Sequence, residues 1–555
     1  MKISFAIIGK EKEKIRGGSM SSSKEEVFIR KSSGLVRPFG TMDAVLIFTL
    51  IIFSILNTTM QFNWFHGFWP GADFVGSIAF ALIPTMLVAL VYWCVAVAMP
   101  RAGSDYVWFA RVVHPAIGFG WSLLYFYMYL CAAFVTICFA FGYTTSMALT
   151  AWGILYNIQP FVEFGTWLQS QWGSFVFALI IMVIYTIIGI AGSKAVKAFL
   201  YVGWAFQIVA LLVYWVVLGT TTTSVFAAKW DQLMGGYISY NAVYTTAASA
   251  GWTWTPISIG ATVASMAFGF MILSGAAFGA GTITGEIRNV NRAIPIGLVL
   301  ANLLSFGIWS LCNVTLLYAT DIKWFTALSW LWANHPETYP LPFPPSTPLM
   351  LAIATHPNQA LTGIAMVTFV LANIAFPLVT YITAARYWFA WGFDRLVPTK
   401  LADVHPRFKT PHIALIVTTI IAMVSGYLYA YLGFANWFAA VSTIMVLSYA
   451  VVSLTVVVFP FTRWKTLLDN LPKFMSKKIA GVPFISIIGL IASIVLFYSA
   501  YAVAVNPLLS ANFDLAAILF GGLFIAGIII YFISKEYHKR QGIDITLGFK
   551  EVPPA

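Results

Sequence analysis

Uncharged apolar runs of about 20 residues recur from one end of the chain to the other, and they restrict the fold more than any other feature. A run of that length crosses a bilayer as an α-helix. A backbone in lipid must satisfy its own polar groups, so only helices or a closed barrel can span. The runs are continuous rather than alternating, which excludes a barrel. Charged residues make up 9% of the 555 positions, far fewer than in a soluble domain. The sequence therefore predicts an all-α integral membrane protein.

We predict twelve spans, and the third and eighth are long enough to tilt or to extend beyond the hydrocarbon. Their predicted ranges are 43–65, 76–99, 117–145, 173–192, 197–218, 261–283, 294–319, 361–390, 411–432, 436–460, 484–506 and 515–533.

The basic residues indicate how these spans are oriented. With the N-terminus inside, the predicted outer loops hold only Lys229 and Lys323 of the 31 Lys and Arg residues. Cytoplasmic loops carry such an excess of positive charge. We therefore expect both termini on the cytoplasmic side of the plasma membrane, and we read the net charge of +12 as this bias rather than as a nucleic-acid surface.

The predicted domain boundaries follow from composition. Residues 1–41 are polar and are expected to form a disordered cytoplasmic tail, in which Met20 is a candidate start because Ser21 onward is typical of a short natural tail. Residues 42–533 are expected to form one domain of twelve helices, and residues 534–555 a cytoplasmic C-terminal tail. Two outer loops, 220–260 and 321–360, are long enough to form short helices.

Several chemistries are disfavoured by what the spans contain. The four Cys residues lie within predicted spans, and no metal-ligand spacing is present, so we expect no disulfide, metal or other cofactor. No Asp, Glu, Lys, Arg or His lies in the middle of a predicted span. Such charges mark proton relays and ion paths, so their absence disfavours a voltage sensor, a proton pump or a carboxylate-driven symporter. It also leaves no acid to pair with a cationic side chain of a substrate.

Two predicted spans contain patterns that favour an interrupted helix. Asn57, Thr58 and Thr59 lie near the middle of span 1, and Ser274, Gly275 and neighbouring small residues lie near the middle of span 6. These spans begin two sets of five, residues 43–218 and 261–460, followed by two extra helices over 484–533. Because five is odd, span 6 runs opposite to span 1, as an inverted repeat requires. The alternative is that the small residues only permit close helix packing.

Three motifs resemble the amino acid–polyamine–organocation (APC) superfamily of permeases. They are MPRAGSDYVW at 99–108, GEIRNVNRAIPIG at 285–297, and ARYWFAWGFDRLVP at 385–398 followed by VHPRFKTP at 404–411. All three lie on the predicted inner face, in the order that the family shows. The resemblance covers spans 1 to about 10 and implies a LeuT-type five-plus-five inverted-repeat transporter.

The resemblance implies a substrate site at the two interrupted helices, where free N–H groups hold a carboxylate and free carbonyls an ammonium. Mapped onto this chain, the substrate-binding residues are Leu56, Asn57, Thr58 and Thr59 on the carboxylate side, Ser274, Gly275, Ala276 and Ala277 on the ammonium side, and Phe278 and Gly279 beside the break. The charged motif residues are expected to form the cytoplasmic gate or scaffold; they are Arg101, Asp105, Glu286, Arg288, Arg292, Arg386 and Asp394.

This chain departs from the family pattern at two places. Asn57, Thr58 and Thr59 replace a glycine-rich break, which puts a standard carboxylate pose in question. Gln207 stands where some members have a titrating lysine, and Asn373 and Thr380 lie near the position of an alternative sodium site, so these three are the coupling candidates.

We expect a secondary transporter, not an enzyme, that moves neutral amino acids by alternating access. Its expected partners are the amino-acid substrate, the lipid bilayer and, as a candidate coupling ion, protons, with no nucleic acid. Exchange, facilitated flux and proton symport remain open. The alternatives are a transporter of another small amine or polar solute, a transporter-like nutrient sensor, and an ion channel, for which neither charge rings nor a carbonyl filter is visible.

Overall fold

The computed structural model of the protein describes residues 37–431, 441–505 and 513–552. The predicted disordered tail therefore lies outside the described residues up to position 36, and so does the candidate start at Met20. The described chain is helical almost throughout, and its one sheet is a two-stranded antiparallel hairpin, β1 (Lys478–Ile479) with β2 (Val482–Pro483). The all-α expectation holds for these residues.

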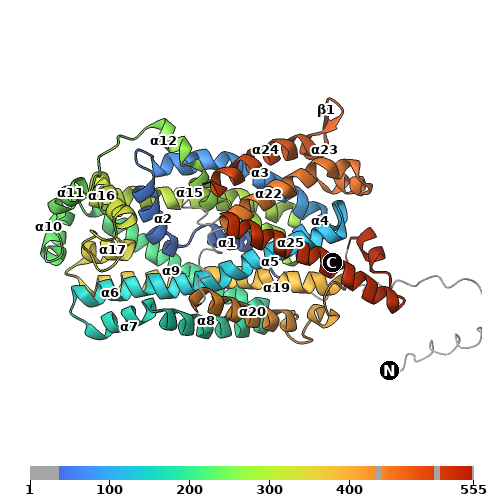
Figure 1. Ribbon diagram of the computed structural model, residues 1–555, viewed down its shortest axis with the longest axis horizontal. Helices are drawn as coiled ribbons and strands as arrows, with labels where there is room; N and C mark the ends of the chain where they lie inside the picture. Colours follow the sequence, from blue (N-terminus) through green and yellow to red (C-terminus); the bar gives the residue numbers. More distant parts are fainter. Residues whose placement is uncertain (1–36, 432–440, 506–512, 553–555) are drawn as a thin grey trace, which may run out of the picture.

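The long helices lie side by side along one direction (Figure 1). In chain order the helices of the predicted spans, together with α6, which begins just after the third predicted span ends, are α1 (Thr41–Ile52), α2 (Ile55–Phe68), α3 (Phe74–Ala98), α5 (Pro115–Ile137), the π-helix η1 (Cys138–Thr145), α6 (Ser146–Leu155), α8 (Gln171–Ala191), α9 (Ser193–Thr220), α12 (Ile259–Ala264), α13 (Met266–Leu273), α14 (Ala276–Thr282), α15 (Val290–Thr320), α18 (Gln359–Ala372), α19 (Ala375–Phe393), α20 (His412–Tyr431), α22 (Val441–Val458), α24 (Phe484–Ala504) and α25 (Phe513–Arg540).

Nine helices of the described chain are long and apolar enough to cross a membrane. Three predicted spans are not among them. The third runs from α5 into the π-helix η1, the sixth is divided among α12, α13 and α14, and the ninth contains the shorter apolar helix within α20. The protein is thus a multi-pass membrane protein, and the count of twelve stays a prediction.

Short helices gather at the two ends of the bundle (Figure 1). At one end lie α7 (Gln159–Gln169), α10 (Thr223–Met234), α11 (Tyr240–Ser249), α16 (Ile322–Asn334) and α17 (Thr347–Thr355), four of them from the two predicted long loops. At the other end, which we call the charged end, lie α4 (Ser104–Val112), the 3₁₀ turns η2 (Thr284–Glu286), η3 (Thr399–Ala402), η4 (Phe459–Phe461), η5 (Arg463–Asn470) and η6 (Ile545–Lys550), and α23 (Lys473–Ser476).

The helices form two packed groups, which contact one another where α9 meets α15 and where α1 meets α19. In the first, α1 packs against α14 and α15, and α3 packs against α13, α14 and α15. In the second, α5 packs against α19 and α20, α8 against α20, and α18 against α9. The first group contains both predicted interrupted spans, so the expected site lies where this group meets the second.

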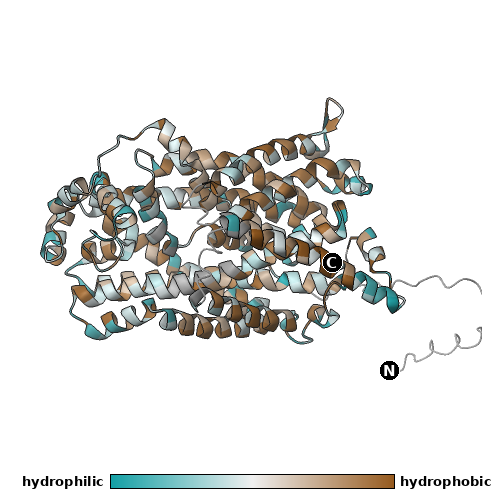
Figure 2. Cartoon of the chain, viewed as in Figure 1, coloured by the Kyte–Doolittle hydropathy of each residue, from teal (hydrophilic) through white to brown (hydrophobic). Residues whose placement is uncertain are grey.

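The outer surface of the bundle suits lipid. Exposed side chains on α25 include Ile518, Ile525 and Ile529, and on α8 they include Ile180 and Ile187. Figure 2 shows apolar residues along the long helices and hydrophilic ones towards the end of α25 and around α10. An exposed apolar surface of this extent is stable only when another apolar phase covers it.

The C-terminal segment is not free of the bundle. Within η6, Phe549 is buried and lies under the guanidinium of Arg111 of α4, 5.2 Å from its carbon to the ring centroid. Arg111 Nε also donates to the carbonyl oxygen of Glu551 at 3.0 Å. These contacts attach the predicted C-terminal tail to the charged end.

Candidate functional site

The first predicted span is interrupted, but three residues before the predicted place. α1 ends at Ile52, Phe53 and Ser54 are extended, and α2 begins at Ile55. The expectation that Asn57 to Thr59 are unwound is therefore wrong, because these residues form the first turns of α2. Phe53 gives a reason for the earlier break: its buried ring packs edge-on against Trp309 of α15, with 5.0 Å between ring centroids.

The predicted interruption of the sixth span lies where expected. α13 ends at Leu273, Ser274 and Gly275 form a turn, and α14 begins at Ala276. A Cβ added to Gly275 would lie 3.0 Å from the carbonyl oxygen of Ile51 in α1. Glycine therefore permits a close approach of the two interrupted helices, so a packing role and a site role are compatible at this residue.

A third interruption, in the eighth predicted span, is not anticipated by the motifs above. α18 ends at Ala372, Asn373 and Ile374 form a turn, and α19 begins at Ala375. Pro377 accounts for it: a proline ring clashes with the carbonyl four residues earlier and offers no N–H to it. That earlier residue is Asn373. The pattern of a polar residue followed four positions later by proline was the signal available in the sequence.

A hydrogen bond joins the first interruption to the third. Ser54 Oγ donates to Asn373 Oδ1 at 2.5 Å, and Asn373 Nδ2 donates to the carbonyl oxygen of Phe369 at 2.7 Å. The Tyr185 hydroxyl of α8 donates to the carbonyl oxygen of Ile374 at 2.5 Å. Because Ile51 contacts Gly275 in the same region, the three interruptions converge on one buried place.

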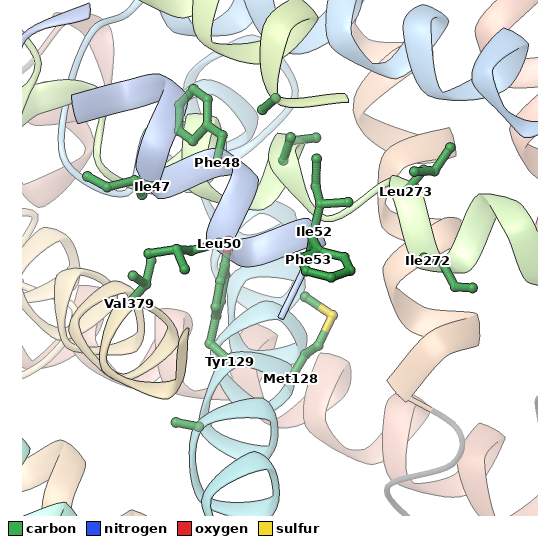
Figure 3. Close-up of a cluster of buried hydrophobic side chains, with 14 of the residues drawn as sticks. Ile47, Phe48, Leu50, Ile52, Phe53, Met128, Tyr129, Ile272, Leu273 and Val379 are labelled. Carbon is green, nitrogen blue, oxygen red and sulfur yellow. The ribbon is translucent and has the colours of Figure 1, made fainter. Parts of the chain in front are cut away.

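The walls of this place are apolar. Phe53, Leu50 and Ile52 come from the first span, Met128 and Tyr129 from α5, and Ile272 and Leu273 from α13, with Val379 of α19 nearby (Figure 3). All of these side chains are buried. The polar groups here are chiefly backbone and uncharged side chains, as in sites that bind small molecules with an apolar part.

The predicted substrate-binding residues lie around these interruptions. Thr58 and Thr59 are buried, and Thr58 Oγ1 donates to the carbonyl oxygen of Ile55 at 2.6 Å. Thr59 Oγ1 and Ser274 Oγ are buried without a hydrogen-bond partner among the described residues. Asn57 is half-buried, and Ala276, Ala277 and Gly279 are buried in α14; the side chains of Leu56 and Phe278 lie outside what the structure describes.

One backbone acceptor of the sixth span already has a donor. The Tyr449 hydroxyl of α22 donates to the carbonyl oxygen of Ser274 at 3.0 Å. This tyrosine was not anticipated from the sequence, since nothing in the apolar tenth span distinguishes it. A substrate ammonium at that carbonyl would have to share or replace this bond.

The three coupling candidates differ in their surroundings. Gln207 of α9 is fully buried, and neither its amide nitrogen nor its oxygen has a partner among the described residues. Gly203, one turn earlier, lies against Ala375 at the start of α19, so this face of α9 points to the third interruption. Thr380 instead donates within its own helix, to the carbonyl oxygen of Pro377 at 2.9 Å.

Ion pairs hold the charged end together. Arg386 Nε of α19 lies 2.5 Å from Glu286 Oε1 of η2, and both side chains are buried. Lys197 Nζ of α9 lies 2.8 Å from Asp43 Oδ2 of α1, and Tyr201 donates to the other oxygen of Asp43 at 2.9 Å. Each pair joins a helix of the first group to one of the second, the position of a gate.

A third ion pair lies farther from the interruptions. Arg111 donates to both oxygens of Asp394, at 2.9 and 3.1 Å, and Tyr106 donates to the same carboxylate at 2.8 Å. Asp394 and Arg386 belong to the same sequence motif, but each pairs with a different segment of the chain. Bidentate pairing with an arginine suits a rigid scaffold.

A small pocket is lined in part by Arg386 and Glu286. Its lining includes Ile47 of α1, Val196 and Leu200 of α9, and Val379 and Ile382 of α19. We call it the Arg386 pocket. It extends from the charged end towards Val379, which also borders the interruptions in Figure 3.

The remaining predicted gate residues make backbone contacts. Arg101 Nη1 donates to the carbonyl oxygen of Pro100 at 2.9 Å, and Arg288 Nε to that of Arg37 at 2.6 Å. Phe39 pairs with the segment after η2 through Phe39 N to Glu286 O at 3.2 Å and Arg288 N to Phe39 O at 2.8 Å. The segment before α1 thus lies across the charged end. Arg292 is exposed at the start of α15.

These features define a multi-pass membrane protein in which helices of two packed groups are interrupted around one buried site, closed at one end by ion pairs. A family model described as "Amino acid permease" matches residues 39–531. The chain belongs to this family of permeases, which is a family of transport proteins and not of enzymes.

Two curated relatives carry a substrate in their names. They are the "Low-affinity putrescine importer PlaP" of Escherichia coli strain K12 and its counterpart in Escherichia coli O157:H7. Each is 24% identical to this chain over 352 residues, which is 62% of this chain. The chain spans 65% of the length of these relatives in the alignment.

Proposed function

We propose that the protein is a secondary transporter that moves neutral amino acids across the plasma membrane by alternating access, with both termini in the cytoplasm. The observation that carries this proposal is the convergence of three interrupted helices, joined by the Ser54–Asn373 hydrogen bond and by the contact of Ile51 with Gly275. Interrupted helices present free N–H and carbonyl groups in a membrane interior, where a zwitterion can use both.

In this proposal the substrate carboxylate lies at the first turn of α2, and the ammonium lies at the end of α13. Ser54 caps α2 without a side-chain bond to its N–H groups, because its hydroxyl is directed to Asn373. The Asn57 N–H already donates to the Ser54 carbonyl oxygen at 2.9 Å, so in this proposal the anion uses the N–H groups of the two residues before it. Tyr449 would yield the Ser274 carbonyl to the ammonium.

The apolar walls favour a small side chain without charge. Burying an unpaired charge against Phe53, Leu50 and Ile272 would cost several kcal/mol. The ion pairs of Asp43–Lys197 and Arg386–Glu286 form the cytoplasmic gate in this scheme, and the Arg386 pocket is part of the exit path.

A second candidate substrate is a small diamine. The names of the two relatives favour it, and so does Asp105, a buried carboxylate at the charged end without an arginine or lysine partner among the ion pairs of the described residues.

Uptake by the purified protein in liposomes tests both candidates. Radiolabelled leucine, alanine, threonine and putrescine would be compared, with and without internal substrate and with and without an inward proton gradient. Saturable uptake of a neutral amino acid, lost in Asn57→Ala and Thr59→Ala, supports the proposal. Saturable putrescine uptake without any response to amino acids replaces it with the diamine.

The same preparation distinguishes a nutrient sensor. Tight binding of an amino acid in a thermal-shift assay, together with no uptake under any gradient, would mean that the fold binds but does not translocate. Single-channel currents in planar bilayers would indicate a channel instead.

A further inference from the structure

Four buried carboxylates lie at the charged end, and one of them differs from the other three. Glu286 is paired with Arg386, Asp394 with Arg111 and Asp43 with Lys197. Asp105 is 3% exposed, yet no arginine or lysine of the described residues forms an ion pair with it. Its oxygens accept hydrogen bonds from the Tyr387 hydroxyl at 3.0 and 3.1 Å and from the backbone N–H of Tyr106 at 3.1 Å.

The groups that face Asp105 are neutral near physiological pH. Tyr387 reaches it from α19, and Tyr92, Tyr125 and Tyr449 lie near it on α3, α5 and α22. Tyrosine titrates only near pH 10 or above. On its own helix, Arg111 and Tyr106 are both directed to Asp394. From α14 the facing residue is Gly281, and α14 contains no titratable side chain. Lys550 of η6 is exposed, and Arg101 donates to Pro100.

A buried carboxylate with only neutral neighbours favours its protonated form. Burial raises the pKa of Asp105 to about 7, although the hydrogen bonds from Tyr387 and from the backbone act in the opposite direction. Each of the other three buried carboxylates forms an ion pair with an Arg or Lys side chain, and Asp105 forms none with the described residues. Asp105 is thus set apart as a group that can gain and lose a proton in the physiological range.

The cover over Asp105 is the segment that follows an interruption. A Cβ added to Gly281 would lie 3.1 Å from Asp105 Oδ2, so α14 rests directly on the carboxyl group. α14 is the short helix between the turn at Ser274 and the ion-paired η2. A displacement of α14 away from α4 would bring water to Asp105.

Buried tyrosines connect this carboxyl to the interruption of the sixth span. Tyr92 and Tyr125 share a hydroxyl–hydroxyl bond of 2.6 Å, and the Tyr92 ring packs edge-on against Tyr449, with centroids 5.5 Å apart. Tyr449 in turn donates to the Ser274 carbonyl. Tyr449 therefore links the Ser274 carbonyl directly to the tyrosines around Asp105.

We propose that Asp105 is the proton-binding residue of the transport cycle: it holds a proton while α14 covers it and releases that proton to cytoplasmic water when α14 moves away. The step breaks the carboxyl O–H bond, transfers the proton to water and leaves a solvated carboxylate, so it needs no further reactant. The inference rests on the proposed alternating-access transport. Asp105 would be a coupling group just outside the predicted spans, so the absence of charged residues from the middle of the spans does not exclude it.

The first test is uptake driven by an inward proton gradient into liposomes that contain the full chain, compared with exchange against internal substrate. In the unmodified protein, the protonated fraction of Asp105 falls roughly tenfold between pH 6 and pH 8, and gradient-driven uptake should fall with it. Asp105→Asn should keep exchange and lose the response to the gradient. A gradient response that persists in Asp105→Asn would overturn the proposal, while uptake itself would still support transport.

Tyr387→Phe gives a second variant in which the carboxyl group is retained. Loss of a hydroxyl that donates to the anion should move the midpoint of the pH profile upward by about one pH unit. Tyr501→Phe is the matched control, because Tyr501 is an exposed tyrosine of α24 and should leave the midpoint unchanged. A midpoint that shifts equally in both variants, or in neither, contradicts a role for the Asp105 carboxyl.

An infrared titration decides the matter without transport. The unmodified protein should show a protonated-carboxyl C=O band that disappears with a midpoint near pH 7, and Asp105→Asn should lack that band. If no solute is transported but the band is present, the proposed function fails and the proton site remains. If transport occurs but the two infrared titrations are identical, the proton site fails alone.

Discussion

Ser54 and Asn373 lie 319 residues apart in the chain and share a buried hydrogen bond of 2.5 Å between their side chains. Each residue lies at an interruption of a different predicted span, and the two spans belong to different packed groups of helices. The bond therefore joins the two groups of helices at the site where we propose that substrate binds. Each extended or turning segment leaves backbone groups without helical partners, which makes the position suited to a ligand.

The first prediction concerns this bond. Ser54→Ala should weaken apparent substrate affinity about fivefold, because a buried neutral hydrogen bond contributes about 1 kcal/mol and Asn373 Oδ1 is left without that donor. Asn373→Ala should have a similar effect, and the double variant should be no worse than either single one. Uptake kinetics of the two single variants and the double variant give the double-mutant cycle. Ser493→Ala is the control, since its hydroxyl bonds within its own helix α24; additive effects of Ser54 and Asn373 would mean that the bond is not functional.

The second prediction concerns the glycine at the sixth-span interruption. Gly275→Leu should abolish uptake, because even a Cβ would lie 3.0 Å from the Ile51 carbonyl oxygen and the rest of the side chain has no room. Gly275→Ala should reduce uptake less. Gly307→Leu provides the control, since nothing lies within 4 Å of a Cβ at that position of α15. Uptake by Gly275→Leu equal to that of Gly307→Leu would place the site elsewhere.

The third prediction concerns the gate. Glu286→Gln should leave Arg386 buried without its anion, at a cost of about 3 kcal/mol or more, which is above a hundredfold in an equilibrium. The charged end should therefore open more often. A cysteine at Val379, which lines the Arg386 pocket, should then react faster with a water-soluble thiol reagent. The background should lack the four native cysteines.

Glu536→Gln is the matched control for the gate variant. Glu536 forms an exposed pair with Arg540, and such pairs contribute little. The Val379→Cys protein should react at the same rate with Glu536→Gln as without it. Equal rates in Glu286→Gln and Glu536→Gln would exclude the gate role of the buried pair.

The fourth prediction concerns stability and pH. The pKa of Asp105 is raised by burial from 3.8 to about 7, so the folded protein binds this proton more tightly than the unfolded chain does. The contribution of Asp105 to the free energy of unfolding is therefore largest below about pH 4. It falls as the pH rises to about 7 and stays constant at higher pH. The loss attributable to Asp105 is on the order of 4 kcal/mol.

Thermal unfolding in detergent at pH 5 and pH 8 measures this difference. Other groups titrate too, so the quantity to compare is the change between the two pH values in the unmodified protein and in Asp105→Asn. The variant should show the smaller decrease in stability at pH 8. An equal decrease in both proteins would mean that Asp105 is ionised in the folded state throughout this range.

The fifth prediction concerns Gln207. Its amide is buried without a partner among the described residues, which is unfavourable unless a ligand or water uses it. Gln207→Leu should leave the free energy of unfolding unchanged or slightly higher without substrate, and should weaken substrate binding or coupling severalfold. Thermal unfolding and uptake kinetics on the same preparation test both parts. Unchanged kinetics would assign Gln207 to the packing of α9 alone.

The sequence determined the class of the protein and most of its helices. Long apolar runs leave helices as the structure that satisfies the backbone in lipid, and the nine long apolar helices of the described chain all fall on predicted spans. It also located the break at Ser274 and Gly275, because a turn between packed helices needs residues small enough for a neighbouring backbone to approach. The charged motif residues were correctly grouped at one end of the bundle.

Only the tertiary structure decided which of those residues meet. The sequence places Arg386, Asp394, Glu286 and Asp105 near the same end. It does not say that Arg386 pairs with Glu286, that Asp394 pairs with Arg111, or that Asp105 accepts hydrogen bonds from a hydroxyl and an N–H group of the described residues and pairs with none of their cations. The break at Phe53 and Ser54 likewise depends on Trp309, more than 250 positions away. Helices follow from local apolarity and backbone satisfaction, which are short-range. Interruptions and partners depend on which neighbouring helix offers a pocket, a hydroxyl or a charge, and that is settled only when the helices pack.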